Sequence, residues 1–455
     1  MVTAAQREHA NLTALTRMCE AEPVLAGVAP AGDVAPGMTD RTILTSGPAV
    51  PFAQYTGGQR AALVYAALYE GLADSPADAE QRMEAGDIVI GACHDHGCVG
   101  SVAGVYTASM PVFVVRNDVH GTTGFCNFYE GESRNRLNYG SYDDGVRRQL
   151  RHIERVIAPT IGAAVHSAGG IPLKPIMRRA VHMGDELHSR NTAATLLFGR
   201  ELFPHLLEAG PGHRDEVLQT LSYLSASDYF FLRLSMASGK AVADAARRIE
   251  ASSVVTAMSI TCRGVSIRVS GLGDEWFDGP FPEVSAKLFD GFTPADIEWI
   301  GGESLINETV GLGGFAQAAA FPLQNYQGGS PEAMIKMNLA MYDITVGENT
   351  DYKIPYLRYR GTPTGIDVLK VVESGITPVL DAGLAGRGGG QIGAGIVRAP
   401  LECFAAAARA YTARYGPDGR CRHGRRRRST RAARGLSRHR SGRRRGRPGR
   451  HRAPG

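Results

Sequence analysis

The strongest constraint on the fold is the way in which hydrophobic patterning changes along the chain. Short β-branched segments at 88–92, 99–106 and 112–115, each bounded by Gly, Pro or Asn, predict strands with little helix between them. The pattern becomes mostly helical at 143–251, and strand signals return after it. A regular alternation of strand and helix would predict a parallel sheet, so this order predicts a mixed α+β fold instead.

This order of patterns divides the chain of 455 residues, which is long enough for two or three domains. We expect an N-terminal α+β domain at 1–142, a small, mainly helical middle domain at 143–251, and a C-terminal α+β domain at 252–419. Near the N-terminus, apolar residues at helical spacing predict an amphipathic helix over 3–20 and a deeply buried helix over 58–72.

The remaining segment, 420–455, contains 16 Arg and no Asp or Glu. Such a composition cannot bury enough apolar surface to offset the entropy of ordering, so we expect this tail to be disordered. A basic tail could bind nucleic acid, but a frameshifted reading of a GC-rich gene gives the same composition, and we favour that origin. Without the tail, residues 1–419 carry 34 basic and 45 acidic side chains, which makes the body a poor ligand for nucleic acid.

The hydrophobic pattern of the sequence predicts neither a signal peptide nor a membrane span. No run of 18 or more apolar residues occurs, and residues 1–10 lack the apolar core of a signal peptide. The seven Cys are odd in number and spread through the chain, which is typical of reduced thiols. We therefore expect a cytoplasmic protein that does not enter a membrane.

The densest group of polar side chains lies at 182–191, and on a helix it would charge two faces of one segment. Burying such a segment is costly unless it lines a site. The alternative is a salt-bridge network on a solvated helix. We favour a site, in which an imidazole moves a proton and a carboxylate orients it. The candidates are His182, Glu186 and His188 for catalysis, Asp185 and Glu186 for a metal, and Arg190 and Asn191 for substrate.

The other candidates are suited to anion binding. Two His in a Gly-bearing loop at 93–98 would point the same way on an extended chain, although ordinary loop packing explains them equally well. A Gly-rich turn at 311–314 before an Ala-rich helix would cradle a phosphate or carboxylate, with tight packing as the equal alternative. Arg suits bidentate capture of such anions. The anion-binding candidates are His94, His96, Arg268, Gly311, Gly313, Gly314 and Arg360.

The sequence contains no complete nucleotide-binding motif in a suitable context. Ser238-Gly239-Lys240 lacks the upstream Gly of a phosphate-binding loop. Gly311-x-Gly313-x-x-Ala316 matches the dinucleotide fingerprint but does not lie in a strand-turn-helix-strand unit. The cofactor is therefore unknown, and a divalent metal is the one that the His and acid residues would suit.

Several longer motifs resemble one family of bacterial proteins. They include Tyr69-Glu70-Gly71, the run at 182–195, the segment 308–320 and the segment 391–404. From about residue 8 to residue 404 the chain resembles the YlbE/YahG family, which was long a domain of unknown function. The resemblance implies a multi-domain α+β protein with a small helical domain in the middle.

One branch of that family, the AllG type, is similar to a subunit of oxamate carbamoyltransferase in allantoin catabolism. That enzyme converts oxalurate and phosphate into oxamate and carbamoyl phosphate, and works with an FdrA-like partner related to succinyl-CoA synthetase. The resemblance implies that this chain is a subunit of such a carbamoyltransferase-type complex, with a small anionic substrate and phosphate as ligands. The carbamoyltransferase signatures S-T-x-T-R and H-P-x-Q are absent from residues 1–419, so any carbamoyl transfer must use another site.

Two other functions compete with this one. The chain could be a non-catalytic partner that stabilises or regulates an FdrA-like subunit. It could also be a metal-dependent amide hydrolase, for which the ligands would be His94, His96, His182 and Asp185.

Overall fold

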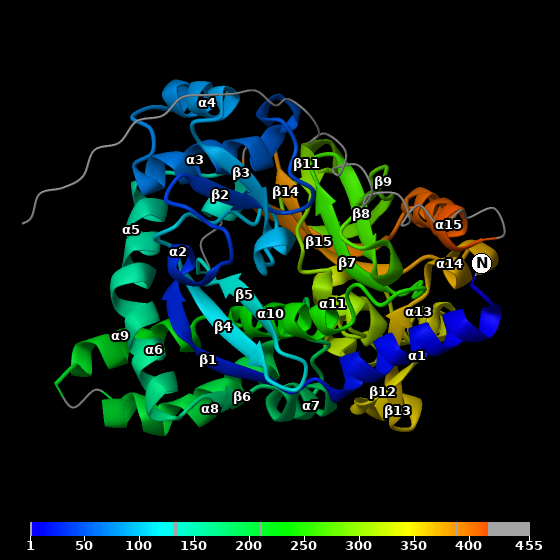
Figure 1. The fold of residues 1–455 in the computed structure, drawn as a ribbon. Helices are drawn as coiled ribbons and strands as arrows, with labels where there is room; N and C mark the ends of the chain where they lie inside the picture. Colours follow the sequence, from blue (N-terminus) through cyan, green and yellow to red (C-terminus); the bar gives the residue numbers. More distant parts are fainter. Residues whose placement is uncertain (1, 132–134, 210–211, 388, 417–455) are drawn as a thin grey trace, which may run out of the picture.

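The computed structural model describes residues 2–131, 135–209, 212–387 and 389–416 and has the predicted mixed α+β fold (Figure 1). The predicted disordered tail at 420–455 lies outside the described residues. Within them, the strands form two four-stranded sheets, one three-stranded sheet and two pairs.

The first four-stranded sheet is antiparallel and has the order β5-β4-β1-β6. Helix α10 (Phe230–Ala245) packs against β4 and β5, and almost every residue of α10 is buried. Figure 1 shows α10 crossing the middle of the molecule, beside β4 and β5. The strands are β1 (Pro23–Pro30), β4 (Pro111–Asn117), β5 (Thr122–Asn127) and β6 (Ile171–Pro172).

Next to this sheet lies a parallel pair of short strands, β2 (Thr42–Thr45) and β3 (Val89–Ala92). The helices of this region are α2 (Ala31–Val34), α3 (Gly57–Glu70) and α4 (Pro76–Ala85), and α3 packs on β2. Helix α3 is the buried helix expected over 58–72, and it ends at Gly71, whose φ of 77° is left-handed and therefore favours glycine.

The stretch 143–251 is helical, as predicted, and in Figure 1 its helices extend from the left edge of the molecule along the bottom to the centre, where α10 lies. A π-helical turn (Ile153–Ile157) joins the first two helices. The two-residue strand β6 lies in this stretch and pairs with β1, so the helices are tied to the first sheet. The domain boundaries at 142 and 251 stay predictions. The helices before α10 are α5 (Asp144–His152), α6 (Ala158–Ser167), α7 (Lys174–His182), α8 (Thr192–Ala209) and α9 (Arg214–Ser225).

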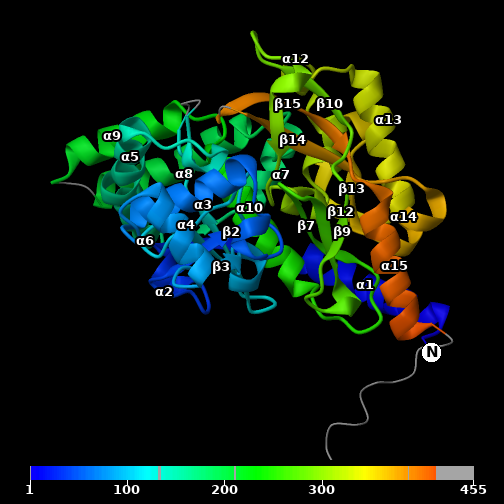
Figure 2. The ribbon, with the colours of Figure 1, turned by 90° about the horizontal axis from the view of Figure 1, so that it is seen from above.

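The C-terminal part contains the second four-stranded sheet, with the order β10-β15-β14-β11, and a three-stranded sheet β7-β8-β9. Figure 2 shows α13, α14 and α15 gathered on the side of these sheets away from α5 and α9. The strands are β7 (Val255–Thr261), β8 (Gly264–Val269), β9 (Phe277–Gly279), β10 (Val284–Leu288), β11 (Ile297–Ile300), β14 (Val379–Gly386) and β15 (Gln391–Arg398).

A hairpin of β12 (Thr345–Ile354) and β13 (Arg360–Ile366) completes the sheets of this part. The N-terminal helix α1 (Ala4–Glu20) packs on this hairpin and on α10, so the first residues of the chain contact its last third. The helices here are α11 (Ile306–Thr309), α12 (Gln324–Gln327), α13 (Pro331–Met341), α14 (Val368–Ser374) and α15 (Leu401–Tyr415).

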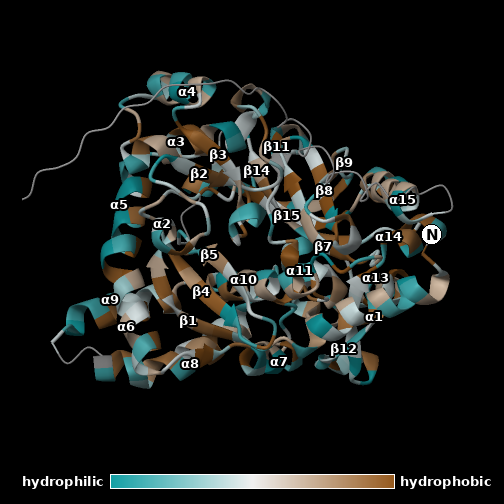
Figure 3. Cartoon of the chain, viewed as in Figure 1, coloured by the Kyte–Doolittle hydropathy of each residue, from teal (hydrophilic) through white to brown (hydrophobic). Residues whose placement is uncertain are grey.

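The hydrophobic core consists of several clusters that do not follow chain order. The largest joins the first sheet to the helical stretch and to α1, and a second joins the C-terminal sheets to α15. Figure 3 shows the apolar residues concentrated along β1 and β4, inside the molecule. No helix of the described residues is long and apolar enough to cross a membrane.

The prediction of a strand at 99–106 is wrong. The chain there makes only isolated bridges to other segments, such as Ser101 with Gly302. Val102 and Gly104 have φ values of 57° and 62°, and Gly100 lies so close to Gly104 that an added Cβ would approach its Cα to 2.2 Å. The apolar residues of this segment are buried in a tight loop, and burial without alternation cannot distinguish such a loop from a strand.

Candidate functional site

The segment 182–191 is not the helix that its spacing predicted. Helix α7 ends at His182, and Gly184 has a φ of 101°, which a residue with a side chain rarely adopts. The chain then runs as a loop until α8 begins at Thr192. Its polar side chains are therefore positioned by a turn and not by a helical repeat.

Glu186 is the centre of this loop. Its buried carboxylate accepts hydrogen bonds from the backbone N–H groups of His188, at 3.0 Å, of Ser189, and of Arg190, at 3.0 Å. Burial, followed by the neighbouring carboxyl of Asp381, nevertheless raises the pKa of Glu186 well above its usual value. The loop is thus folded around a carboxyl group that a second acid approaches.

His188 lies in the same loop and contacts a third acid. Its Nδ1 lies 2.7 Å from Oε1 of Glu308, and both side chains are buried. Burial lowers the pKa of His188, but the Glu308 carboxylate outweighs burial, so the net pKa is raised above its usual value. The side-chain amide of Asn191 donates to the carbonyl of His188 at 2.8 Å and holds the loop in place.

The Gly-rich turn at 311–314 does bind a carboxylate, but this carboxylate is the side chain of Glu308 from the same protein. The backbone N–H of Gly314 donates to Glu308 at 3.1 Å, and that of Gly313 donates to the carbonyl of Glu186 at 2.8 Å. A Cβ added at Gly313 would lie 2.4 Å from the Glu308 carboxylate. These contacts agree with the tight-packing alternative for Gly313 and Gly314, and anion binding by Gly311, Gly313 and Gly314 stays a prediction.

The Ala-rich helix expected after this turn is also absent. Short 3-10 turns, Gly313–Phe315 and Gln317–Ala319, take its place. The amide of Asn338 accepts from the N–H of Ala318 at 3.0 Å and donates to the carbonyl of Phe315 at 2.9 Å, which diverts backbone groups that a helix would pair. No helix terminus is therefore available here to bind an anion.

Asp381, in the apolar strand β14, completes the cluster. Its backbone N–H donates to Glu308 Oε1 at 3.0 Å, and its Oδ1 accepts from Gln317 and Gln327 at 2.7 and 3.0 Å. Burial, followed by Glu308, raises the pKa of Asp381 to about 7. Three buried acids therefore surround the imidazole of His188.

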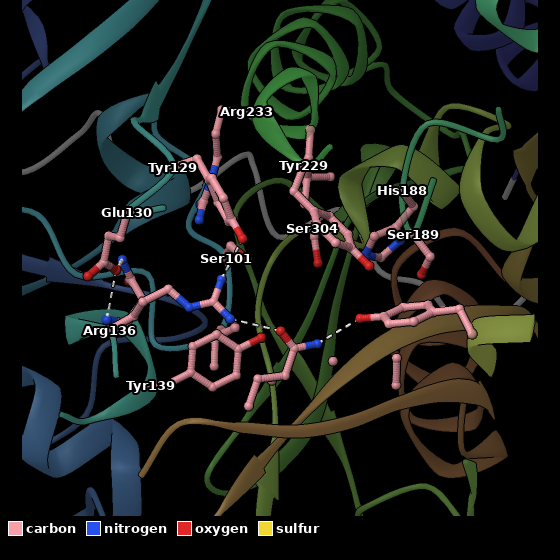
Figure 4. Close-up of a pocket in the computed structure, with 18 residues that line it drawn as sticks. Ser101, Tyr129, Glu130, Arg136, Tyr139, His188, Ser189, Tyr229, Arg233 and Ser304 are labelled. Atoms are coloured by element: carbon pink, nitrogen blue, oxygen red, sulfur yellow. Dashed lines mark hydrogen bonds between the residues drawn. The ribbon is translucent and has the colours of Figure 1, made fainter. Parts of the chain in front are cut away.

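This cluster borders a small, partly open polar cavity of about 50 Å³, which has room for roughly four waters. Its walls come from every third of the chain, because the 99–106 loop, the start of α10, the 182–191 loop and β14–β15 all contribute. In Figure 4, Arg136 and Arg233 approach the cavity from one side, and His188 and Ser189 from the other.

The two Arg of the cavity wall are almost fully buried, with 8% of Arg136 and 4% of Arg233 exposed. Arg136 donates to the Tyr129 hydroxyl at 3.0 Å and to Gln391 at 2.8 Å. Arg233 donates to Asn127 at 3.1 Å, and among the described residues it forms no ion pair. A buried guanidinium without a carboxylate is costly unless an anion reaches it.

One acid, Glu130, also lines this end of the cavity. Its carboxylate accepts from the N–H of Leu137 at 2.6 Å and from the N–H and amide of Asn138 at 3.0 and 2.6 Å. These bonds hold the segment that carries Arg136. Among the described residues that line this end of the cavity, the charged side chains are these two guanidinium groups and the Glu130 carboxylate.

Three of the predicted site residues lie elsewhere. His182 is exposed, and its ring meets the edge of Tyr359 at 5.7 Å. Arg360 is exposed and pairs with Glu348 at 2.7 Å. His96 is bonded to the carbonyl of Pro36 at 2.7 Å, in a 3-10 turn that separates it from His94. The structure therefore does not bring these three to the cavity.

Two others, His94 and Arg268, are buried together behind the 99–106 loop. Arg268 donates to Asp95 at 2.7 Å and its guanidinium stacks 4.3 Å from the ring of Trp276. Burial, followed by Lys240 and Arg268, lowers the pKa of His94 well below its usual value, so its ring is neutral. These residues adjoin the cavity wall but are not part of it.

The remaining two candidates, Asp185 and Arg190, form an ion pair with each other. Asp185 also accepts from the N–H of Ala194 at 2.8 Å, within the first turn of α8. The carboxylate therefore fixes the start of a helix. Among the described residues, the acids and His that lie close enough to share a metal ion are His188, Glu308 and Asp381. The ligand set expected for a hydrolase is not assembled.

Sequence patterns missed Arg136, Arg233, Glu308 and Asp381 as site residues. Arg233 is a lone charge inside the apolar run of α10, and Asp381 is a lone acid in the apolar strand β14. A single charge in a segment that must be buried is a signal that could have identified both.

The fold and this site define a mixed α+β protein with a small polar cavity beside a buried cluster of acids. The family model described as oxamate carbamoyltransferase subunit AllG matches residues 88–304. The uncharacterized protein YahG of Escherichia coli K12 is 39% identical over 409 residues, which cover 90% of this chain and 86% of YahG. The oxamate carbamoyltransferase subunit AllG of the same organism is 36% identical over 400 residues, 87% of this chain and 95% of AllG. The chain belongs to the AllG/YahG family.

A solved structure shares this fold. The crystal structure of a conserved protein of unknown function from Enterococcus faecalis V583 matches with a TM-score of 0.88 and 36% sequence identity. The match covers 91% of this chain and 99% of that protein. The family model and the two Escherichia coli relatives confirm the predicted resemblance to the family.

Proposed function

We propose that this chain is a subunit of a carbamoyltransferase-type complex, and that its cavity binds a small acyl-urea such as oxalurate for phosphorolysis. The supporting observation is the small polar cavity with two buried guanidinium groups at one end. The name of the AllG relative, a subunit of oxamate carbamoyltransferase, points to the same chemistry.

The size and charge of the cavity support a small anionic substrate. The cavity of about 50 Å³ is far smaller than a nucleotide or a coenzyme A requires, and in this proposal it widens when the acyl-urea and phosphate displace its water. The carboxylate of the substrate would lie against Arg233, which has no carboxylate partner among the described residues. Arg136 would bind the same end, held in place by Tyr129 and Gln391.

The opposite end of the cavity, at His188, Ser189 and Ser304, would hold the carbamoyl group. There an oxygen of hydrogen phosphate attacks the carbamoyl carbon, and the bond from that carbon to the amide nitrogen breaks. The nitrogen takes up the proton that the phosphate gives up, so oxamate and carbamoyl phosphate form without another reactant. The cavity contributes by orienting the substrate and excluding water.

In this proposal the chain works in a complex, with an FdrA-like protein as its partner. The AllG relative is named as a subunit, which supports an assembly of some kind. The first experiment is to measure carbamoyl phosphate formation from oxalurate and phosphate, using the full chain alone and with its FdrA-like partner. Activity that needs both proteins is the expected result.

The decisive variant is Arg233→Met, which removes the charge and keeps an unbranched apolar side chain in place of the buried stem. A charge-assisted hydrogen bond is worth about 1.5–3 kcal/mol, so kcat/KM for oxalurate should fall roughly 10- to 150-fold. The matched control is Arg360→Ala, because Arg360 is exposed and paired outside the cavity. If both variants keep the activity of the wild-type complex, the chain is a non-catalytic partner and the proposed function is wrong.

A further inference from the structure

We propose that His188, Glu308 and Asp381 bind a divalent metal ion at the end of the cavity. The three side chains come from the 182–191 loop, from α11 and from β14, and all are buried. One ligand atom from each lies within 4.8 Å of the other two. Ligands of one metal ion lie about 3–4 Å apart when each bond is about 2.1 Å long, so small side-chain rotations close the site.

In each of the two carboxylates, one oxygen accepts several hydrogen bonds and the other oxygen does not. Oε1 of Glu308 accepts three hydrogen bonds, from the His188 ring and from the N–H groups of Gly314 and Asp381. Oδ1 of Asp381 accepts two hydrogen bonds, from the side-chain amides of Gln317 and Gln327. Their other oxygens, Oε2 of Glu308 and Oδ2 of Asp381, are buried and accept from no N–H or hydroxyl donor among the described residues, and the Asp381 carboxyl meets that of Glu186.

Carboxylates that ligate a metal ion commonly have one oxygen held by hydrogen bonds and the other directed at the ion. Donors that hold one oxygen of a ligating carboxylate fix its orientation and leave the second oxygen for the ion. An unpartnered carboxylate oxygen in the interior otherwise carries the full cost of its lost hydration. Two such oxygens from different segments, beside one imidazole, therefore indicate a cation that the protein chain alone does not supply.

The charge balance leads to the same conclusion. Glu186 adds a third carboxyl beside Asp381, so three acids face one imidazole in a region without exposure to water. Like charges at this distance repel strongly where the dielectric constant is low. A divalent cation would convert this repulsion into attraction.

The mixed nitrogen and oxygen ligands favour an ion of the Mn²⁺ or Zn²⁺ class over Ca²⁺, which prefers six to eight oxygens. Only three protein ligands are present, which leaves positions open, as in catalytic metal sites. His188 also lines the cavity, so an open position would face a bound ligand. That role, polarising the carbamoyl group or holding phosphate, rests on the proposed function, whereas the binding of the ion does not.

The test measures binding without any substrate. The full chain is treated with EDTA, dialysed, and titrated with MnCl₂ while the electron paramagnetic resonance signal of free Mn²⁺ is recorded, with ZnCl₂ followed by calorimetry. We expect about one equivalent of at least one of the two ions to bind, and the affinity to fall at least 100-fold in Asp381→Asn and Glu308→Gln.

The matched control is Glu303→Gln, since Glu303 is an equally buried acid outside the trio. It should bind the ion as the wild type does. If the ligand variants do not fold, the melting temperature of the wild-type chain, which should rise with added Mn²⁺ or Zn²⁺, decides the matter. Absence of binding at millimolar ion, or binding that both ligand variants retain, would overturn the proposal. Binding without phosphorolysis would overturn the proposed function and leave the metal site intact.

Discussion

The buried carboxyl of Glu303 should make the stability of this protein fall as the pH rises from 5 to 8. Its two oxygens accept from the N–H groups of Gly47 and Gly100, at 2.7 and 2.9 Å, and so hold the loop that carries the cavity residue Ser101. Its pKa is raised from 4.5 to about 7, first by burial, although these hydrogen bonds and the cations Lys240 and Arg268 oppose the shift.

The sign follows from the direction of this shift. Between pH 4.5 and 7 the folded state keeps a proton on Glu303 that the unfolded state has lost, so raising the pH favours unfolding. A shift of about 2.5 pKa units corresponds to roughly 3 kcal/mol. This contribution is complete below pH 4.5 and is lost as the pH passes 7.

The assay is urea unfolding of wild type and Glu303→Gln at pH 5 and pH 8, followed by fluorescence, to which Trp276 contributes from the same region. The variant cannot titrate, so its loss of stability between the two pH values should be roughly 2–3 kcal/mol smaller than that of the wild type, since part of the contribution is already lost at pH 5. Other buried acids, such as Asp381, act in both proteins and cancel in the difference. An equal loss in both proteins would refute the reasoning.

Three further outcomes are expected. His182→Ala should keep kcat/KM within about twofold, because His182 is exposed outside the cavity, and steady-state kinetics of the complex would reveal any larger loss. Tyr326→Phe should lower kcat/KM about tenfold, because the hydroxyl accepts a hydrogen bond from Gln391 at 2.8 Å in the cavity wall; unchanged kinetics would contradict this role. Gly314→Ala should lower the free energy of unfolding by about 3 kcal/mol, since its Cβ would lie 2.2 Å from the carbonyl oxygen of Val379, and a denaturation midpoint like that of the wild type would speak against it.

The sequence could predict the fold class and most elements, because these depend on local patterns. The periodicity of 3–20 and 58–72 identified α1 and α3, and short β-branched runs identified β3, β4, β7 and β8. The helical stretch at 143–251 was also visible in the pattern. Motifs quoted from the whole chain were sufficient to recognise the family.

Local patterns were misleading where glycine or a distant side chain decides the backbone. Gly184 ends α7 and turns 182–191 into a loop, so helical spacing placed His182 beside Glu186 although only Glu186 is buried. Asn338, far along the chain, diverts the hydrogen bonds of 315–318 and prevents the expected helix. The glycine lies in the segment and is a recognised signal for a helix end, so helical spacing was given too much weight there, whereas the effect of Asn338 cannot be derived from the pattern of 315–318.

By itself, the sequence determined which side chains could carry chemistry, and it identified His188 and Glu186 among them. Tertiary structure alone decided their neighbours. Asp381 approaches Glu186, and Glu308 approaches His188, only because β14 and α11 pack against the 182–191 loop. A cluster of this kind depends on contacts between residues more than a hundred positions apart, and secondary-structure periodicity carries no information about which distant segments will meet.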